Sequence, residues 1–370
     1  MSRAKMSPTS PSRPSPGYQG TGSCDFVGTI FSANMKFSKL SYGIGATVLA
    51  AFVYLLYQSH TGTEPHTAGD IYMQAPPANQ KARILQGSFS AERRSAVHEQ
   101  SFQPMVIPRV RNASFDYKAA MEKLNEAKVS QDDPRLIQLI RDYYIEPPSV
   151  EAYHLDSPDR LEFSNGQTPF IDSRLNYMEG GFYVECGALN GEKGSNTLFF
   201  EKVRKWNGLL VEADPSNYQA LKSKHRKAFT VNACLSPQPY PAMVTFNKAF
   251  NRGRVVDNNE AKDWIHQQGI SKDEVSVQCF PLYSLLLALN QLTVDFFSLD
   301  VEGDELRVLK TIPFDKVDIK MMTVEYVHQV GKDGDLKSFV EKKGYDNMLQ
   351  MSRWDGGVND VIFRKKGLQH

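Results

Sequence analysis

Short apolar runs alternate with amphipathic stretches through the second half of the chain. The apolar runs cover residues 182–186, 209–212, 229–234, 275–279, 294–301 and 321–326. Helical periodicity lies between them, over residues 195–206, 215–224, 282–289, 304–311 and 335–343. This alternation predicts βαβ units and therefore an α/β fold with a mostly parallel sheet that is covered on both faces. Residues 345–351 and 358–364 are predicted to end the sheet as an antiparallel hairpin.

The overall composition excludes two classes of protein. The 370 residues carry 43 Lys and Arg against 42 Asp and Glu, a net charge of +1. A nucleic-acid-binding protein is expected to have a clustered excess of positive charge, so nucleic acid is not a predicted partner. Four cysteines are too few for a fold that depends on disulfides, so the core must come from apolar burial.

The N-terminal third has a different character. Residues 1–36 are rich in proline, serine and glycine, which predicts a disordered tail. Residues 40–57 contain no charged side chain and as a helix would measure about 27 Å, enough to cross a thin hydrocarbon core. We therefore predict a transmembrane signal-anchor helix at residues 37–58, with a buried core helix and a cleaved signal peptide as the alternatives.

The charges beside this span predict its orientation. Five Lys and Arg residues precede it, whereas the first positive charge after it is Lys81. The positive-inside rule then places the tail in the cytosol and everything after residue 58 in a lumen or outside the cell. The only N-x-S/T sequon, at Asn112, lies on that side and is a candidate glycosylation site. We expect a flexible stem at 59–114 and a helical lead-in at 115–175.

Acidic residues follow the predicted strands at their carboxyl ends, the edge at which open α/β sheets bind ligands. Glu185 precedes a turn that contains Gly187 and Gly191, and Glu212 ends the next strand, where a carboxylate can accept hydrogen bonds from a ribose diol. Asp300, Glu302 and Glu305 follow a later strand, and Glu325 and His328 follow the one after it. The alternative is that single acids, such as Asp300 or Asp304, only cap the following helices.

Three stretches resemble the FkbM-type family of methyltransferases: FYVECGALNG from Phe182, LLVEADP from Leu209 and VDFFSLDVEGDE from Val294. The resemblance implies a Rossmann-like class I methyltransferase fold at residues 176–366, with a seven-stranded sheet, that uses S-adenosylmethionine. It also implies donor contacts from Glu185, Gly187, Asn190, Gly191, Glu212 and Asp214, and a base among Asp300, Glu302 and His328. One departure is that Leu189 stands where the family usually has asparagine.

A wider resemblance covers about residues 130–365 and the N-terminal span. Stretches such as DPRLI from Asp133, SNTLFFE from Ser195 and WNGLLVEADP from Trp206 are similar to those of the Star-like family of invertebrate single-pass membrane proteins. This resemblance implies transport of membrane cargo, such as precursors of epidermal-growth-factor-receptor ligands, from endoplasmic reticulum to Golgi. It places the chain in those membranes, with endosome or plasma membrane as alternatives. The second hypothesis is an active S-adenosylmethionine-dependent O-methyltransferase.

Three of the four cysteines lie on the predicted lumenal side: Cys186, Cys234 and Cys279. Cys186 and Cys234 end strands that normally have a third strand between them, about 9 to 10 Å apart, which is too far for a disulfide. We therefore predict that Cys186 and Cys234 are reduced thiols with a structural role.

Overall fold

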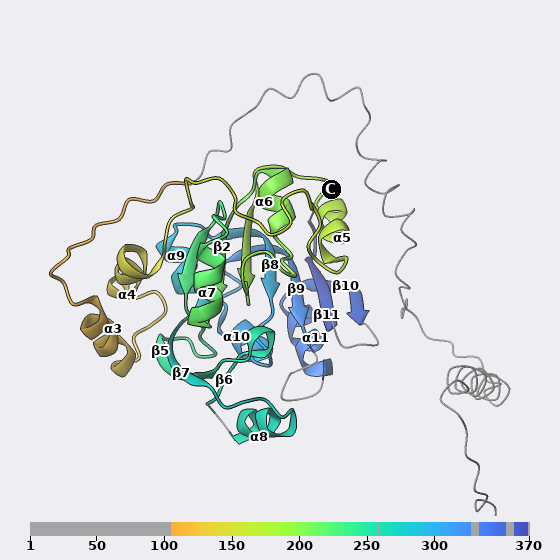
Figure 1. Ribbon diagram of the computed structural model, residues 1–370. Helices are drawn as coiled ribbons and strands as arrows, with labels where there is room; N and C mark the ends of the chain where they lie inside the picture. Colours follow the sequence, from red (N-terminus) through yellow and green to blue (C-terminus); the bar gives the residue numbers. More distant parts are fainter. Residues whose placement is uncertain (1–104, 258, 327–332, 353–358, 369–370) are drawn as a thin grey trace, which may run out of the picture. The chain divides into compact units, whose positions relative to one another are not determined.

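In the computed structural model of the protein, residues 105–257, 259–326, 333–352 and 359–368 are described. They contain a seven-stranded sheet with the strand order β10-β11-β9-β8-β1-β2-β3 (Figure 1). Only β11 runs antiparallel to its neighbours, so the predicted parallel sheet with a final antiparallel hairpin is confirmed. The strands are β1 (Phe182–Cys186), β2 (Asn207–Glu212), β3 (Phe229–Asn232), β8 (Thr293–Leu299), β9 (Asp318–Glu325), β10 (Tyr345–Ser352) and β11 (Asn359–Lys365).

A second, four-stranded sheet has the order β4-β7-β5-β6. Its strands are β4 (Cys234–Leu235), β5 (Ala242–Asn247), β6 (Arg254–Val255) and β7 (Glu274–Phe280). The prediction of one strand over residues 229–234 is wrong, because β3 stops at Asn232 and the chain then pairs with β7. The Asn232 side chain donates hydrogen bonds to the carbonyl oxygens of Glu212 and Ala213, which marks the point of departure from the main sheet.

This change of sheet also corrects the prediction for Cys234. The parallel register of β4 and β7 places Cys234 opposite Cys279, with 4.4 Å between their Cα atoms, and the two form a disulfide. Cys186 is a buried free cysteine, as predicted. It ends β1 of the main sheet, whereas Cys234 lies in β4 of the second sheet and is bonded to Cys279. The sequence analysis did not assign Cys279 a partner strand, and for this reason it missed the bond.

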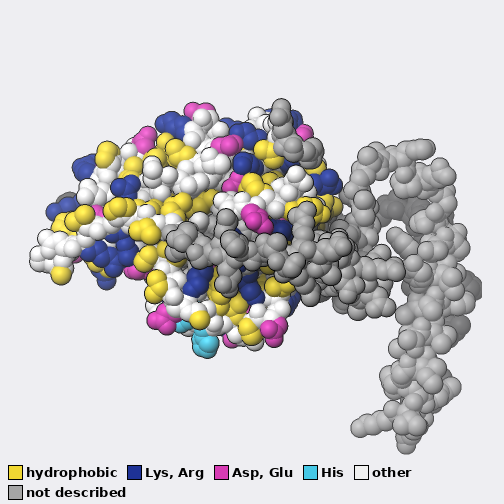
Figure 2. Space-filling view, turned by 90° about the horizontal axis from the view of Figure 1, so that it is seen from above, with side chains coloured by type: hydrophobic (Ala, Val, Ile, Leu, Met, Phe, Trp, Pro, Cys, Tyr) yellow, Lys and Arg dark blue, Asp and Glu magenta, His cyan; other side chains and the backbone are white. Residues whose placement is uncertain are grey.

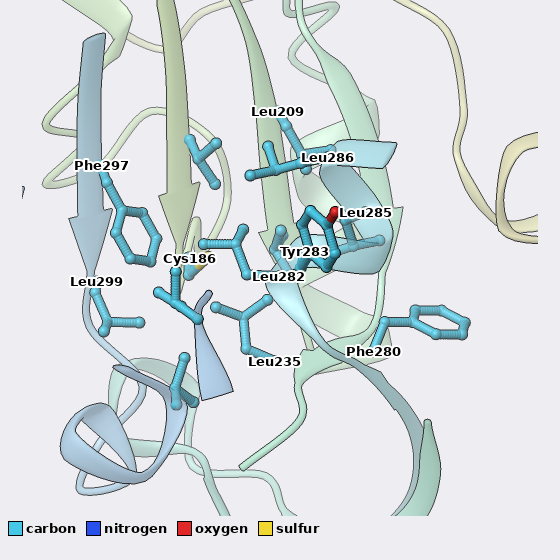
Figure 3. Close-up of a cluster of buried hydrophobic side chains, with 14 of the residues drawn as sticks. Cys186, Leu209, Leu235, Phe280, Leu282, Tyr283, Leu285, Leu286, Phe297 and Leu299 are labelled. Carbon is cyan, nitrogen blue, oxygen red and sulfur yellow. The ribbon is translucent and has the colours of Figure 1, made fainter. Parts of the chain in front are cut away.

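One face of the main sheet carries the larger part of the core. Leu209, Phe297 and Leu299 on this face pack against Leu282 and Leu286 of α9 (Figure 3). Apolar side chains of five further helices join this cluster. The helices that contribute to it, α9 included, are α3 (Tyr117–Glu126), α4 (Pro134–Leu139), the π-helix η2 (Ile140–Tyr144), α9 (Leu282–Ala288), α10 (Glu305–Thr311) and α11 (Asp333–Lys342).

The opposite face packs on a smaller cluster that contains Tyr183, Phe200, Trp206 and Phe296, all of them buried. It is covered by α5 (Gln167–Arg174), α6 (Leu198–Arg204) and α7 (Pro215–Lys222). Two further elements, the 3-10 helix η3 (Phe250–Arg252) and α8 (Asn259–Gln267), lie in the insertion between β5 and β7. Because both faces of the sheet are covered, its central strands are apolar on both sides, as the runs in the sequence predict.

Within the described residues, no helix is both long and apolar enough to span a membrane. The predicted tail, transmembrane segment and most of the stem fall at residues 1–104, outside the described part. On the face drawn in Figure 2, Lys and Arg side chains are dispersed among acidic and apolar ones. A nucleic-acid-binding face would present a continuous basic stripe. The prediction of no nucleic-acid partner nevertheless stays a prediction.

Candidate active site

The alternation of side chains along the strands places five carboxylates on one face of the sheet. Residues Tyr183, Leu210 and Phe296 belong to the smaller cluster, so Glu185, Glu212 and Asp300, an even number of positions further on, point to that same face. Glu325 on β9 lies four positions after Met321, and Asp360 on β11 lies two positions before Ile362. Met321 and Ile362 also belong to the smaller cluster, so these two acids point to the same face. These acids therefore follow one another across five neighbouring strands, in the order Asp360, Glu325, Asp300, Glu185 and Glu212.

Glu185 organises the loop that follows β1. Its carboxylate accepts hydrogen bonds from the hydroxyls of Ser195 and Thr197, at 2.9 and 2.7 Å, and from the backbone N–H of Asn196, at 2.7 Å. Burial raises the pKa of Glu185, and the charge of Arg226 opposes this effect. Because its hydrogen bonds go to the loop, Glu185 supports the site by holding residues 195–197 in place.

Arg226 holds the same loop from the other side. Its side chain is fully buried and lies 3.0 Å from the buried Glu201 carboxylate. It also donates hydrogen bonds to the carbonyl oxygen of Gly191 and to the Thr197 hydroxyl. The loop is thus fixed by the buried Glu185 and the buried Arg226, of which the sequence analysis singled out only Glu185.

Glu212 forms part of the wall of the site. Its carboxylate accepts backbone N–H groups from Leu189, at 2.7 Å, and from Asp214, at 2.8 Å. Burial raises the pKa of Glu212 to about 7, and these two hydrogen bonds limit the rise. A carboxylate offers about four lone-pair positions, so Glu212 retains acceptor capacity for a ligand.

Three residues of the turn after β1 lie in the left-handed region: Gly187, Leu189 and Gly191. Gly187 has a φ of +79°, and a Cβ atom there would lie 2.0 Å from the carbonyl oxygen of Asp300, so only glycine fits. Leu189 has a φ of +50°, a conformation that asparagine adopts more easily than leucine. The Leu189 N–H that bonds to Glu212 is available because the turn takes this shape.

A second acidic group lies beyond β8 and β9. Single oxygens of Asp300, Glu305 and Glu325 all lie within 4.8 Å of one another, close enough to ligate a metal ion. Glu305 also accepts the backbone N–H groups of Val301 and Gly303. Asp300 and Glu325 are hydrogen-bonded through their carboxyl groups, which requires a shared proton. Desolvation within the cavity raises the pKa of Asp300 to about 8, burial raises that of Glu302 to about 9, and neighbouring acids add to both shifts.

Asp300, Glu302 and Glu325 line a cavity of about 460 Å³ at the carboxyl edge of the sheet, to which Glu305 does not contribute. This volume lies in the range of small-molecule sites. One part of the wall is apolar and includes Val211, Ala213, Ala233 and Leu235. The acidic part includes Asp300, Glu302, Asp304, Glu325 and Asp360, and Lys193 and Arg252 also line the cavity.

The predicted site residues are distributed unequally around this cavity. Gly187, Glu212, Asp300 and Glu302 line it. The Asn190 side chain instead accepts N–H groups from Glu192 and Lys193, and Asp214 caps α7 through the N–H of Ser216. His328 lies outside the described residues. The Asn190, Asp214 and His328 assignments stay predictions. Glu185 and Gly191 instead hold the loop after β1: Glu185 accepts the N–H of Asn196, and the Gly191 carbonyl oxygen accepts from Arg226.

Several lining residues were missed by the sequence analysis, among them Asp360, Asn196, Lys193 and Arg252. Asp360 lies on β11, where it accepts a hydrogen bond from Gln167 at 2.5 Å. It does not end a strand, so no turn signal marks it. Asn196 donates to the Ser298 hydroxyl at 3.0 Å from within the loop after β1. In the sequence, Ser195-Asn196-Thr197 looks like an ordinary helix-capping segment. Only the contact with Ser298 on β8 shows that Asn196 belongs to the site.

The acidic group predicts an unusual pH dependence of stability. The pKa values of Asp300, Glu302, Glu305, Glu325, Asp360 and Glu185 are all raised, while Arg252 and Arg254 partly offset the shift at Glu302. Folded protein therefore retains protons that unfolded chains have already lost. Stability contributed by these groups is present below about pH 4 and is lost as pH rises through about 7 to 9.

If the folded protein retains one proton that the unfolded chain has lost, the free energy of unfolding should fall by about 3 kcal/mol between about pH 6 and about pH 8. Solvent screening at the accessible Asp300 makes the expected fall smaller. Urea unfolding of the full-length protein at both values tests this. Glu302→Gln should flatten the dependence, whereas Glu341→Gln on the exposed side of α11 should leave it unchanged. A free energy that rises with pH in the wild type would contradict the assignment.

Comparison with known proteins gives a family match over this region. Residues 185–346 match the model of the methyltransferase FkbM domain. No curated protein matches the sequence. Among solved structures, methyltransferase FkbM from Methylobacillus flagellatus KT has 13% identity and a TM-score of 0.31, over 67% of this chain and 58% of that one. The alignment thus spans less than two thirds of that relative.

A TehB-like SAM-dependent methyltransferase from Corynebacterium glutamicum has 13% identity and a TM-score of 0.30, over 54% of this chain and 88% of that one. A precorrin-6y C5,15-methyltransferase from Geobacter metallireducens has 10% identity and a TM-score of 0.29, over 56% of this chain and 93% of that one. The strand order, the cavity at its carboxyl edge and the family match agree on the type of domain. Residues 185–346 of this chain therefore form an FkbM methyltransferase-like domain.

Proposed function

We propose that this domain binds S-adenosylmethionine and transfers its methyl group to an acceptor. The observation that supports the proposal best is the cavity of about 460 Å³, with Gly187 and Glu212 in its wall at the carboxyl edge of the sheet. This is the position at which an open α/β sheet binds a nucleoside, and Glu212 retains acceptor capacity there.

The lining residues fit such a donor. Val211, Ala213 and Ala233 offer an apolar surface to an adenine ring, and Glu212 can accept hydrogen bonds from a ribose diol. Leu189 has no polar side chain for the carboxylate of the methionine part. Lys193 and Arg252 line the same cavity and supply positive charge instead.

The chain's own residues would then position the acceptor and remove its proton. When bound, S-adenosylmethionine supplies a methyl group that is already activated by a positively charged sulfur. Asp300 is the candidate base, because it is accessible from the cavity and its raised pKa suits proton transfer near neutral pH.

Donor binding by Glu212 is the direct test. We expect S-adenosylhomocysteine to bind the full-length protein, and Glu212→Gln to weaken binding about tenfold, because an amide offers one acceptor oxygen in place of two. Isothermal titration calorimetry measures both, with the exposed Glu341→Gln as the matched control. Absence of any binding of the donor product to folded wild-type protein would refute the proposal.

We further propose that the domain resides in an oxidising compartment, on the lumenal side of endoplasmic reticulum and Golgi membranes. The Cys234–Cys279 disulfide supports this, because disulfides persist in such compartments and are rare in the cytosol. Asn112 is exposed, as a glycosylation acceptor must be. The predicted span at residues 37–58 would supply the anchor.

Lumenal placement favours a second function, Star-like transport of membrane cargo from endoplasmic reticulum to Golgi. A donor made in the cytosol would need import, whereas a cargo-binding scaffold needs no donor. Under this proposal, co-precipitation of precursors of epidermal-growth-factor-receptor ligands is expected to persist in a Glu212→Ala, Asp300→Ala double variant. Loss of cargo transport in that variant, with the protein folded and correctly located, would favour the enzyme.

A further inference from the structure

The chain around Asn112 is held against the π-helix η2. The Val110 N–H donates to the Asp142 carboxylate at 3.0 Å, and the Arg111 guanidinium donates to the Asp142 carbonyl oxygen at 2.6 Å. The Asn112 N–H donates to the Tyr143 hydroxyl at 3.0 Å. A group attached to the Asn112 side chain would therefore start from a fixed point beside the Tyr143 hydroxyl.

The Asn112 side chain leaves its amide nitrogen available. Its oxygen accepts hydrogen bonds from the N–H and the hydroxyl of Ser114, at 3.0 and 2.8 Å. Within the described residues the amide nitrogen Nδ2 makes no hydrogen bond, and Asn112 is exposed. This nitrogen is the atom to which an N-linked glycan is attached. The turn therefore presents to solvent the atom that glycosylation modifies.

An exposed aromatic residue follows the sequon in the same turn. The Phe115 N–H donates to the Asn112 carbonyl oxygen at 3.1 Å, and 44% of Phe115 is exposed. The Phe115 ring lies 5.5 Å from the Tyr143 ring, which in turn stacks on the Tyr117 ring at 5.0 Å. One face of a sugar ring carries mainly C–H groups, which an aromatic face attracts through its negative quadrupole. Phe115 therefore offers a platform to the first sugar on Asn112, and the contact would remove apolar surface from water.

The aromatic surface continues into a second cavity of about 1180 Å³, which residues of α3, η2 and α7 line. This volume is at the upper end of ordinary small-molecule sites, so it has room for several sugars. Its lining includes the tyrosines Tyr117, Tyr143, Tyr144, Tyr218 and Tyr240. Four acidic side chains and three lysines of the described part also line it, so its charge is nearly balanced. Such a wall suits an uncharged ligand with many hydroxyls better than an anion or a cation.

We propose that an N-linked glycan on Asn112 packs its first sugar on Phe115 and continues along this tyrosine-lined cavity. The inference rests on the proposed lumenal placement of the domain. Attachment forms a bond from Nδ2 to the anomeric carbon of a lipid-linked oligosaccharide, while the nitrogen loses one proton and the lipid pyrophosphate leaves. Because Tyr143 both holds Asn112 and lines the cavity, the glycan is tethered at the cavity rim. Its effective concentration there is high, so weak contacts are sufficient for docking.

The test is a cycle of stability measurements on full-length protein purified from animal cells. Thermal unfolding compares wild type, Asn112→Gln, Phe115→Ala and the double variant, and intact mass shows which molecules carry a glycan. The glycan should raise the unfolding temperature by about 2 °C in the Phe115 background and leave it unchanged in the Phe115→Ala background. Val150→Ala, at a side chain that is 96% exposed, is the control and should leave the glycan's effect intact. Trimming the glycan to its first sugar should remove part of the shift, because the cavity then loses its occupant.

The outcomes separate this inference from the proposed placement. If Asn112 carries a glycan but the shift is absent, or is equal in the two backgrounds, docking is overturned and the lumenal placement stands. If trimming removes none of the shift, the glycan does not occupy the cavity and that part of the proposal is wrong. Protein that has the Cys234–Cys279 disulfide but no glycan overturns the inference alone, whereas protein with neither overturns the placement as well.

Discussion

Replacement of Arg226 by methionine is expected to destabilise the protein by about 3 to 5 kcal/mol. Both Arg226 and Glu201 are fully buried, and the guanidinium donates to Glu201, Gly191 and Thr197. Removal of the arginine leaves a buried carboxylate without its main counter-charge, together with unsatisfied groups in the loop after β1. Urea unfolding of wild type and variant measures the difference.

Two further variants make the Arg226 result interpretable. Adding Glu201→Gln to Arg226→Met should recover part of the loss, because the orphaned charge is gone. Lys365→Met breaks the exposed pair between Lys365 and Asp318, and we expect it to cost at most about 1 kcal/mol. If Arg226→Met costs no more than Lys365→Met, the buried pair does not hold the loop as described.

Removal of the Cys234–Cys279 disulfide should cost about 2 to 5 kcal/mol. The bond joins residues 45 positions apart and ties β4 to β7 beside the cavity, in whose wall Cys234 lies. A Cys234→Ala, Cys279→Ala variant should therefore unfold at lower urea concentration. It should also bind S-adenosylhomocysteine more weakly, because the wall residues Ala233 and Leu235 flank the lost bond.

Reduction provides an independent check of the bond. Dithiothreitol should lower the stability of wild type to that of the double variant and leave the variant itself unchanged. Cys186→Ala removes the buried free thiol, so this variant should keep its sensitivity to the reductant. An intact mass of unreduced wild-type protein that shows Cys186, Cys234 and Cys279 all as free thiols would refute the pairing.

Much of the sheet could be predicted from the sequence because local patterns determine it. The apolar run at residues 182–186 matches β1 in both bounds, and the runs ending at Glu212 and starting at Tyr345 match β2 and β10 at those ends. Asp133 followed by Pro134 is a helix-start signal of this local kind: α4 begins at Pro134, and the Asp133 side chain accepts the N–H of Arg135. Such signals need only residues within one turn of each other.

The second sheet could not be predicted, for a physical reason. Strand β5 is partly exposed along its length and lies in a polar insertion, so it lacks the continuous apolar run of a buried strand. Strand β4 has only two residues, and its pairing with β7 depends on where β3 leaves Asn232. The disulfide follows from this register alone. Cysteine spacing in the sequence contains no information about it.

The site shows the same division. The sequence by itself determined that acids such as Glu212, Asp300 and Glu325 follow strands, and that a turn with Gly187 follows β1. Only the tertiary structure decided which acids meet a ligand, because strand order and register place Asp360 beside Glu325 and turn Glu185 toward the loop. Burial then distinguishes a supporting carboxylate from one exposed to the cavity, and burial is a property of packing across the sheet that no single stretch of sequence contains.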